Sequence, residues 1–210
     1  NKEIKLVMLR SSWTHKIARQ LVMPLFHTPI KPDHITIVRL LTGIVACIMF
    51  ASGIRFWEVL GGFIWVLSTL LDCADGELAR MRNQCSEWGH KFDFFSDITV
   101  IALFFIGIGI GSRDSMPELV AVILGFIVAQ GVVVAAVLAE KIDQIKEESG
   151  DKAYPGIAGF NFDDILFLFA LIIWVDWQMY FLVGASIGAP LFALLTFYKL
   201  RQINPDACRS

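Results

Sequence analysis

The chain has 210 residues, of which 56% are hydrophobic and 18% are charged, and its formal net charge is −2. A soluble domain carries about 25% charged residues, and its apolar residues do not form runs as long as those found here. The composition therefore excludes a soluble globular protein and indicates an integral membrane protein. No strongly basic stretch suggests nucleic acid as a partner, so the expected surroundings are the lipid bilayer.

The first predicted element is an amphipathic helix over residues 11–26. Trp13, Ile17, Leu21 and Leu25 recur at every fourth position, and polar residues fill the other faces. This pattern is typical of a helix that lies in the membrane interface with its apolar side toward the lipid. The alternative is an ordinary helix packed on the rest of the protein.

Six apolar stretches follow, and most approach the roughly 20 residues that a helix needs to cross the hydrocarbon core. They span residues 35–52, 57–78, 92–110, 117–139, 162–175 and 179–200. We expect α-helices because a lipid-facing backbone must satisfy its own hydrogen bonds. The predicted fold is all-α, with six transmembrane helices after the interfacial helix. The expected parts are an N-terminal segment (1–34), the six-helix membrane domain (35–200) and a tail (201–210).

The distribution of Lys and Arg predicts the orientation. All but three of the 18 basic residues lie on one side of the predicted membrane domain. The exceptions are Arg39, inside the first span, and Arg55 and Arg113, on the other side. By the positive-inside rule both termini face the cytoplasm. In a bacterium the membrane would be the cytoplasmic membrane.

Four aspartates, named the signature aspartates below, lie at the cytoplasmic boundary. Asp72 and Asp75 end the second span, and Asp93 and Asp97 begin the third. An acidic residue at membrane depth costs about 2.5–3.5 kcal/mol, so four together need a compensating cation. Each pair shares one helical face. Because helices joined by a short turn pack antiparallel, with axes about 8–10 Å apart, we expect the two acidic stripes to face each other.

The chemistry of these stripes indicates a metal site. Ligand sets made only of oxygen favour hard cations such as Mg²⁺ or Mn²⁺. Four carboxylates can hold two such ions about 3.5–4 Å apart, which suits displacement at phosphorus. Gly76 and Gly89 carry no side chain on the acidic faces and would let a nucleotide or pyrophosphate approach the backbone. Close helix packing is the alternative for both glycines.

The spacing of these residues resembles a known signature. The pattern reads Asp72-x-x-Asp75-Gly76-x-x-Ala79-Arg80, then eight residues, then Gly89-x-x-x-Asp93-x-x-x-Asp97, and it resembles that of the CDP-alcohol phosphotransferases. The resemblance implies two Mg²⁺ or Mn²⁺ ions on Asp72, Asp75, Asp93 and Asp97. It also implies that Asp97 is the general base and that Gly76, Ala79, Arg80 and Gly89 line the nucleotide pocket.

The resemblance further implies an activity and partners. The expected reaction transfers a phosphatidyl group from CDP-diacylglycerol to a small polar alcohol and releases CMP. The active site would face the cytoplasm, and the enzyme would be a homodimer. One alternative is the same chemistry with a CDP-linked head group and a lipid alcohol as acceptor. The other, of a different class, is a non-enzymatic divalent-cation transporter, because intramembrane carboxylates also mark ion pathways.

Some further residues are weaker candidates. Residues 31–36 resemble the family's Pro-Asn-x-x-Thr entry to the first span, with Asp33 in place of Asn, and Thr36 would approach the nucleotide. Asp33 could instead cap the helix. Contacts with the acceptor or with phosphate are expected of Arg39, Arg82, Lys141 and Asn161. The alternatives are snorkelling for Arg39 and topology signals for Arg82 and Lys141.

The position after the last signature aspartate bears on the acceptor. Several members of the family carry a basic residue there that helps to hold a phosphorylated acceptor. This chain has Ile98, which argues against a phosphorylated acceptor.

Overall fold

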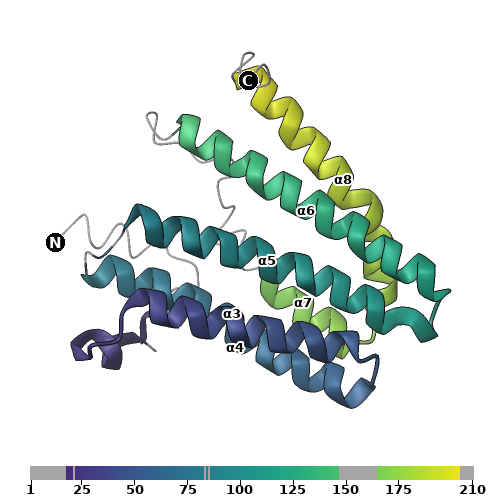
Figure 1. The fold of residues 1–210 in the computed structure, drawn as a ribbon, viewed down its shortest axis with the longest axis horizontal. Coiled ribbons are helices and arrows are strands. Elements are labelled where there is room, and N and C mark those ends of the chain that lie inside the picture. The colour runs from purple at the N-terminus through teal and green to yellow at the C-terminus, as the bar shows by residue number, and fades with distance from the viewer. Residues whose placement is uncertain (1–17, 21, 83, 85, 147–164, 204–210) are drawn as a thin grey trace.

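The structure, a computed structural model, describes residues 18–20, 22–82, 84, 86–146 and 165–203. Every regular element in these ranges is a helix (Figure 1). The elements are η1 (Met23–His27), α3 (Pro32–Ala51), α4 (Arg55–Arg82), α5 (Glu87–Gly111), η2 (Ser112–Asp114), α6 (Glu118–Lys146), α7 (Ile165–Trp174) and α8 (Gln178–Ile203). The prediction of an all-α membrane protein is confirmed.

Five of these helices, α3, α4, α5, α6 and α8, are long and apolar enough to cross a membrane. The predicted fifth span corresponds to α7, an apolar helix of only 10 residues. Residues 162–164, the start of that predicted span, lie outside the described residues. The described part of the chain therefore supports five full spans, and the sixth remains a prediction.

Local features of the sequence explain where α3 and α5 begin. Pro32 opens α3, where its missing N–H costs no hydrogen bond, and the N–H of Lys31 donates to Nδ1 of His34 at 3.3 Å. Asp33 lies within the first turn of α3 and is not its N-cap. Ser86 caps α5, because its Oγ accepts a 3.0 Å hydrogen bond from the N–H of Gly89. These caps place the start of α3 and the start of α5 at the same end of the bundle (Figure 1).

Helix α3 packs against both α4 and α5, whereas the backbones of α4 and α5 make few close contacts within the described ranges. Helices α4 and α5 run antiparallel as expected (Figure 1) and touch through side chains such as Trp65 and Phe104. Their backbones lie farther apart than expected, because α3 packs against both. Gly43 explains the arrangement, since a Cβ there would lie 2.8 Å from Cγ1 of Val100 on α5 and 3.1 Å from Oγ of Ser68 on α4. A glycine at this position lets α3 approach both neighbours closely. On the far side of α5, helix α6 packs against α5 and α8 (Figure 1).

An aromatic core joins α3, α4, α5 and α7. Phe50, Trp65, Phe104 and Phe169 are at most 8% exposed, and the Trp65 and Phe104 rings lie 4.7 Å apart. The indole N–H of Trp65 also donates to the carbonyl of Leu166 at 2.9 Å. Buried indole groups need such a partner, and here the bond fixes α7 against α4.

Arg55 closes the opposite end of the bundle. Its guanidinium donates to the carbonyls of Ile173 at 2.6 Å and Trp174 at 2.5 Å, at the C-terminus of α7. It also pairs with Glu58 at 3.6 Å and Asp176 at 3.5 Å. A cation at a helix C-terminus satisfies unpaired carbonyls and complements the helix dipole. We call this group of contacts the outer clasp.

Residues 11–17 and 21 of the N-terminal helix predicted over residues 11–26 lie outside the described residues. Its last part differs from the prediction, because Met23–His27 is a 3₁₀ helix that contains a proline without a backbone N–H. Ala18 and Val22 are fully buried in a cluster that includes Leu78 of α4. Ala18 and Val22 thus pack on the bundle. The side chains of the predicted apolar face lie outside the described residues, so the interfacial position stays a prediction.

Candidate metal and nucleotide site

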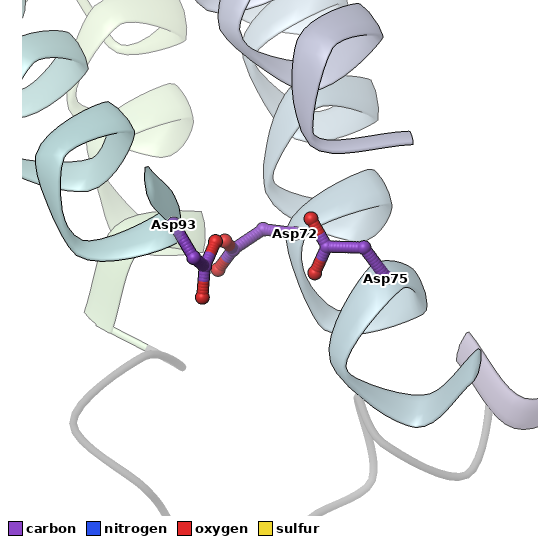
Figure 2. A group of neighbouring side chains, drawn as sticks. All are labelled: Asp72, Asp75 and Asp93. Atoms are coloured by element: carbon purple, nitrogen blue, oxygen red, sulfur yellow. The ribbon is translucent and has the colours of Figure 1, made fainter. Parts of the chain in front are cut away.

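Three signature aspartates form a compact cluster. Asp72 and Asp75 lie near the end of α4, and Asp93 lies near the start of α5. One carboxylate oxygen from each lies within 4.8 Å of the others. Figure 2 shows Asp93 reaching from α5 toward Asp72, with Asp75 beside it on α4. The prediction that the two acidic stripes face each other is confirmed for these residues.

Exposure changes across the cluster. Asp75 is 3% exposed, and the Asp72 side chain is 14% exposed. The side chains of Asp93 and Asp97 are 38% and 34% exposed. The two aspartates of α5 therefore form the side of the cluster that a ligand from water can reach.

The side chain of Arg39 on α3 links the three clustered aspartates to Asp97. Its Nε lies 3.2 Å from Oδ1 of Asp72, and its Nη1 lies 3.9 Å from Oδ1 of Asp93. Its Nη2 forms an ion pair with Oδ1 of Asp97. The Arg39 side chain is only 3% exposed. Sequence reasoning placed Arg39 near the site, and the structure directs its guanidinium at three signature carboxylates.

Thr36 lies one turn before Arg39 and is 4% exposed. Its hydroxyl donates to Oδ2 of Asp75 at 2.6 Å. The contact expected from the sequence was with the nucleotide, and the structure shows this contact with a carboxylate. The Oγ of Ser68 on α4 donates to the carbonyl of Arg39 at 2.9 Å, so α4 also holds the α3 backbone in place.

The donor set fits a hard divalent cation. The three clustered residues supply only carboxylate oxygens, from two helices, at separations that one ion can bridge. Asp97 joins the same group through Arg39. The hydroxyl of Thr36 donates to Oδ2 of the buried Asp75 and so fixes the position of this carboxylate within the cluster.

The small residues of the signature lie beside the acidic cluster. A Cβ at Gly76 would meet only the Arg80 guanidinium, with its nearest atom at 3.5 Å. Arg80 is exposed and pairs with Glu77 at 2.8 Å. A Cβ at Gly89 would lie 3.0 Å from Oγ of Ser86, a tight contact, and 3.6 Å from Oδ1 of Asp33. Ala79 is half-buried on the same stretch of α4. Gly76 therefore leaves room next to a flexible cation, which suits the approach of a phosphate.

Arg82, at the end of α4, holds the segment before α3. Its guanidinium donates to the carbonyls of Phe26 at 2.9 Å, Thr28 at 2.8 Å and Ile30 at 2.5 Å. These contacts were not predicted. From the sequence, Arg82 was expected either to contact the acceptor or to act only as a signal for membrane orientation. Arginine is suited to them because its planar fork presents several donors at once.

The other weak candidates are spread apart. Lys141 is exposed on α6, beyond Glu140, whose Oε1 lies 3.1 Å from Nε2 of His90 on α5. The 3.1 Å contact ties the start of α5 to the end of α6. Asn161 lies outside the described residues, so its predicted contact with the acceptor stays a prediction.

Comparison with known proteins bears on this site. Two similar solved structures are of Mycobacterium tuberculosis phosphatidylinositol phosphate synthase (PgsA1), one with CDP-DAG bound and one in complex with manganese and citrate. Each is 22% identical over 90% of this chain, covers 90% or 86% of its own chain, and has a TM-score of 0.58. At this identity the likeness shows the shared fold. A comparison with curated proteins finds no match.

The family assignment comes from the sequence match. Residues 30–196 match the family described as CDP-alcohol phosphatidyltransferase. The matched range contains α3 to α7, most of α8 and every signature residue. The chain is thus a phosphotransferase that belongs to the CDP-alcohol phosphatidyltransferase family.

Proposed function

We propose that the protein transfers a phosphatidyl group from CDP-diacylglycerol to a small polar alcohol and releases CMP, using two Mg²⁺ or Mn²⁺ ions. The observation that carries this proposal is the cluster of Asp72, Asp75 and Asp93, whose carboxylate oxygens lie within 4.8 Å of one another. The similar structures support the donor and the metal, since one holds CDP-DAG and the other manganese.

Under this proposal, each signature residue has a specific role. Asp72, Asp75 and Asp93 hold the ions, and Asp97 completes the set. When bound, the ions supply positive charge that stabilises the phosphate oxygens and the departing CMP. The cytidine nucleotide would lie along Gly76, Ala79 and Gly89, beside the acidic cluster, and Arg80 would contact its phosphates or support the pocket.

Asp97 is the proposed general base. Its side chain is 34% exposed and lies one turn along α5 from Asp93. It accepts the proton of the acceptor hydroxyl while the hydroxyl oxygen forms a bond to the donor phosphorus next to the diacylglycerol. The bond from that phosphorus to the oxygen of CMP then breaks, and CMP leaves. A base must lie within hydrogen-bond reach of the proton that it removes, and the exposed side of the cluster gives the acceptor this access.

An acceptor without a phosphate fits the chain better than a phosphorylated one. Ile98 follows Asp97 where a basic residue would hold a phosphate. Arg82 donates to three backbone carbonyls, which occupy its guanidinium. Contacts from Lys141 and Asn161 to the acceptor stay part of the proposal. The CDP-linked head group with a lipid alcohol acceptor is the second candidate.

We also propose that the site and both termini face the cytoplasm and that the enzyme works as a homodimer. The orientation rests on the excess of Lys and Arg on that side. The homodimer rests on the family alone.

The test is CMP release by purified protein in detergent, with Mn²⁺ or Mg²⁺ present. CDP-diacylglycerol is offered with a panel of polar alcohols, and CDP-choline or CDP-ethanolamine with diacylglycerol. We expect CMP only with CDP-diacylglycerol and a polar alcohol, and none after EDTA. Release only with diacylglycerol would select the second candidate. Absence of both CMP release and nucleotide binding would overturn the enzyme and revive the cation transporter.

A further inference from the structure

Arg39 is a buried cation that the signature does not contain. Its side chain is 3% exposed, inside the first membrane span. A charged group at such a depth is stable only with partners of opposite charge. Here the partners are Asp72, Asp93 and Asp97, and a different nitrogen of the guanidinium faces each one.

These partners lie on two helices whose backbones make few close contacts in the described part of the chain. Asp72 belongs to α4, whereas Asp93 and Asp97 belong to α5. Arg39 lies on α3, which packs against both. Through this guanidinium, α3 joins the acidic stripe of α4 to that of α5.

Charge shows why such a link is needed. Four carboxylates within one small region repel one another, and the repulsion is strong where water is partly excluded. A single guanidinium with three nitrogens facing three carboxylates offsets part of it, as arginine does better than lysine. The same positive charge must also oppose any further cation that approaches the cluster.

We infer that Arg39 is the resident cation of the metal site: it stabilises the acidic cluster when no ion is bound, and it lowers the affinity of the cluster for divalent ions. Arg39 is thus a positioning residue that acts through the aspartates. This differs from a direct contact with substrate phosphate, because the guanidinium is directed at carboxylates. The inference rests on the proposed metal site.

If this inference is right, removing the charge of Arg39 lowers the stability of the metal-free protein and raises its affinity for divalent ions, and these two changes can be measured separately. Arg39→Gln removes the charge, Arg39→Lys keeps it, and Arg55→Gln removes an arginine with ion pairs of the same kind from the outer clasp. Each variant is purified in detergent. Its unfolding temperature is measured in EDTA, and binding of Mn²⁺ alone is measured by titration, with free Mn²⁺ followed by electron paramagnetic resonance.

For Arg39→Gln we expect a metal-free unfolding temperature lower by ~5 °C and Mn²⁺ binding tighter by about tenfold. Arg39→Lys should bind Mn²⁺ within about threefold of the wild type, because the charge is kept. Arg55→Gln should lower the unfolding temperature and leave Mn²⁺ affinity unchanged. A merely structural role for Arg39 would lower stability and weaken Mn²⁺ binding together.

Unchanged or weaker Mn²⁺ binding in Arg39→Gln would overturn the inference. Failure of the wild type to bind Mn²⁺ would instead overturn the metal site on which it rests. If Arg39→Gln does not fold, the double variant Arg39→Gln with Asp97→Asn removes one charge of each sign. Recovery of folded protein would then support the inference, and failure to recover it would count against it.

Discussion

The hydroxyl of Thr36 donates a 2.6 Å hydrogen bond to Oδ2 of Asp75, and so joins the second turn of α3 to the acidic end of α4. Both residues are at most 4% exposed. A buried acceptor that loses its hydrogen-bond donor costs about 1–3 kcal/mol. The residue that holds the most buried aspartate therefore lies outside the signature.

Thr36→Val should lower the free energy of unfolding by about 1–3 kcal/mol, because the side chain keeps its shape and loses the hydroxyl. Denaturant unfolding in detergent measures this change. Thr36→Ser keeps the hydroxyl and is the matched control. A Val variant as stable as the wild type would show that the bond contributes nothing.

Asp97→Asn should reduce CMP release by at least about 10²-fold, since a carboxamide cannot accept the proton of the acceptor. The fold should persist, because the side chain is 34% exposed and Asn has the same size. CMP release is measured beside thermal unfolding and gel filtration. Full turnover in a folded Asn variant would remove Asp97 as the base.

Gly76→Ala should weaken CDP binding without harming the fold. The added Cβ would meet the guanidinium of Arg80 at 3.5 Å, an ordinary contact distance, and alanine favours the helix by about 1 kcal/mol over glycine. Calorimetric titration with CDP and thermal unfolding measure the two effects. Gly188→Ala, with nothing within 4 Å of its Cβ, is the control. Equal CDP affinity in both variants would argue against a nucleotide at Gly76.

Gly43→Ala should destabilise the protein by about 1–3 kcal/mol, because its Cβ would lie 2.8 Å from a methyl group of Val100. The displaced α3 carries Arg39, so CMP release should fall as well. Gly184→Ala on α8 is the matched control, since its Cβ would meet nothing within 4 Å. The prediction fails if both alanine variants unfold at the same denaturant concentration.

Arg82→Gln should loosen the segment before α3, because three carbonyls lose their charged donor. We expect a loss of about 2–4 kcal/mol in the free energy of unfolding and faster proteolysis near residues 23–30. Arg80→Gln is the comparison for stability, since its pair with Glu77 is exposed and such pairs contribute about 0–1 kcal/mol. Similar stability of both variants would contradict a holding role for Arg82.

The parts of the site that sequence reasoning predicted depend on local geometry. The spacing of Asp72 and Asp75, and of Asp93 and Asp97, determines which residues share a helical face. The predicted spans coincide with the apolar middles of the helices, because apolar length is also a local signal, but α4, α5 and α6 extend four to seven residues beyond them at their polar ends. These rules need no knowledge of which helices are neighbours in space.

What the sequence did not predict depends on packing between distant segments. The short connection between α4 and α5 predicted that their backbones pack closely, but α3 has the closest backbone contacts with both. Gly43 was one signal, since a small residue in a span often marks a close helix contact. Arg39 was a second signal, because a charge inside a span requires partners of opposite charge. The sequence alone did not show which carboxylates these partners are. The three carbonyls that bind Arg82 had no side-chain signal, since any residue provides a carbonyl.

The signature aspartates all lie at one end of the bundle, opposite the outer clasp. The metal ions and the nucleotide of the proposed reaction would therefore enter from the aqueous compartment at that end, without crossing the bilayer. In sealed vesicles that contain the protein in a single orientation, turnover would follow the free metal concentration of one compartment only. A chelator confined to the other side would leave the reaction unaffected, so the enzyme would respond to the ion supply on one side of its membrane.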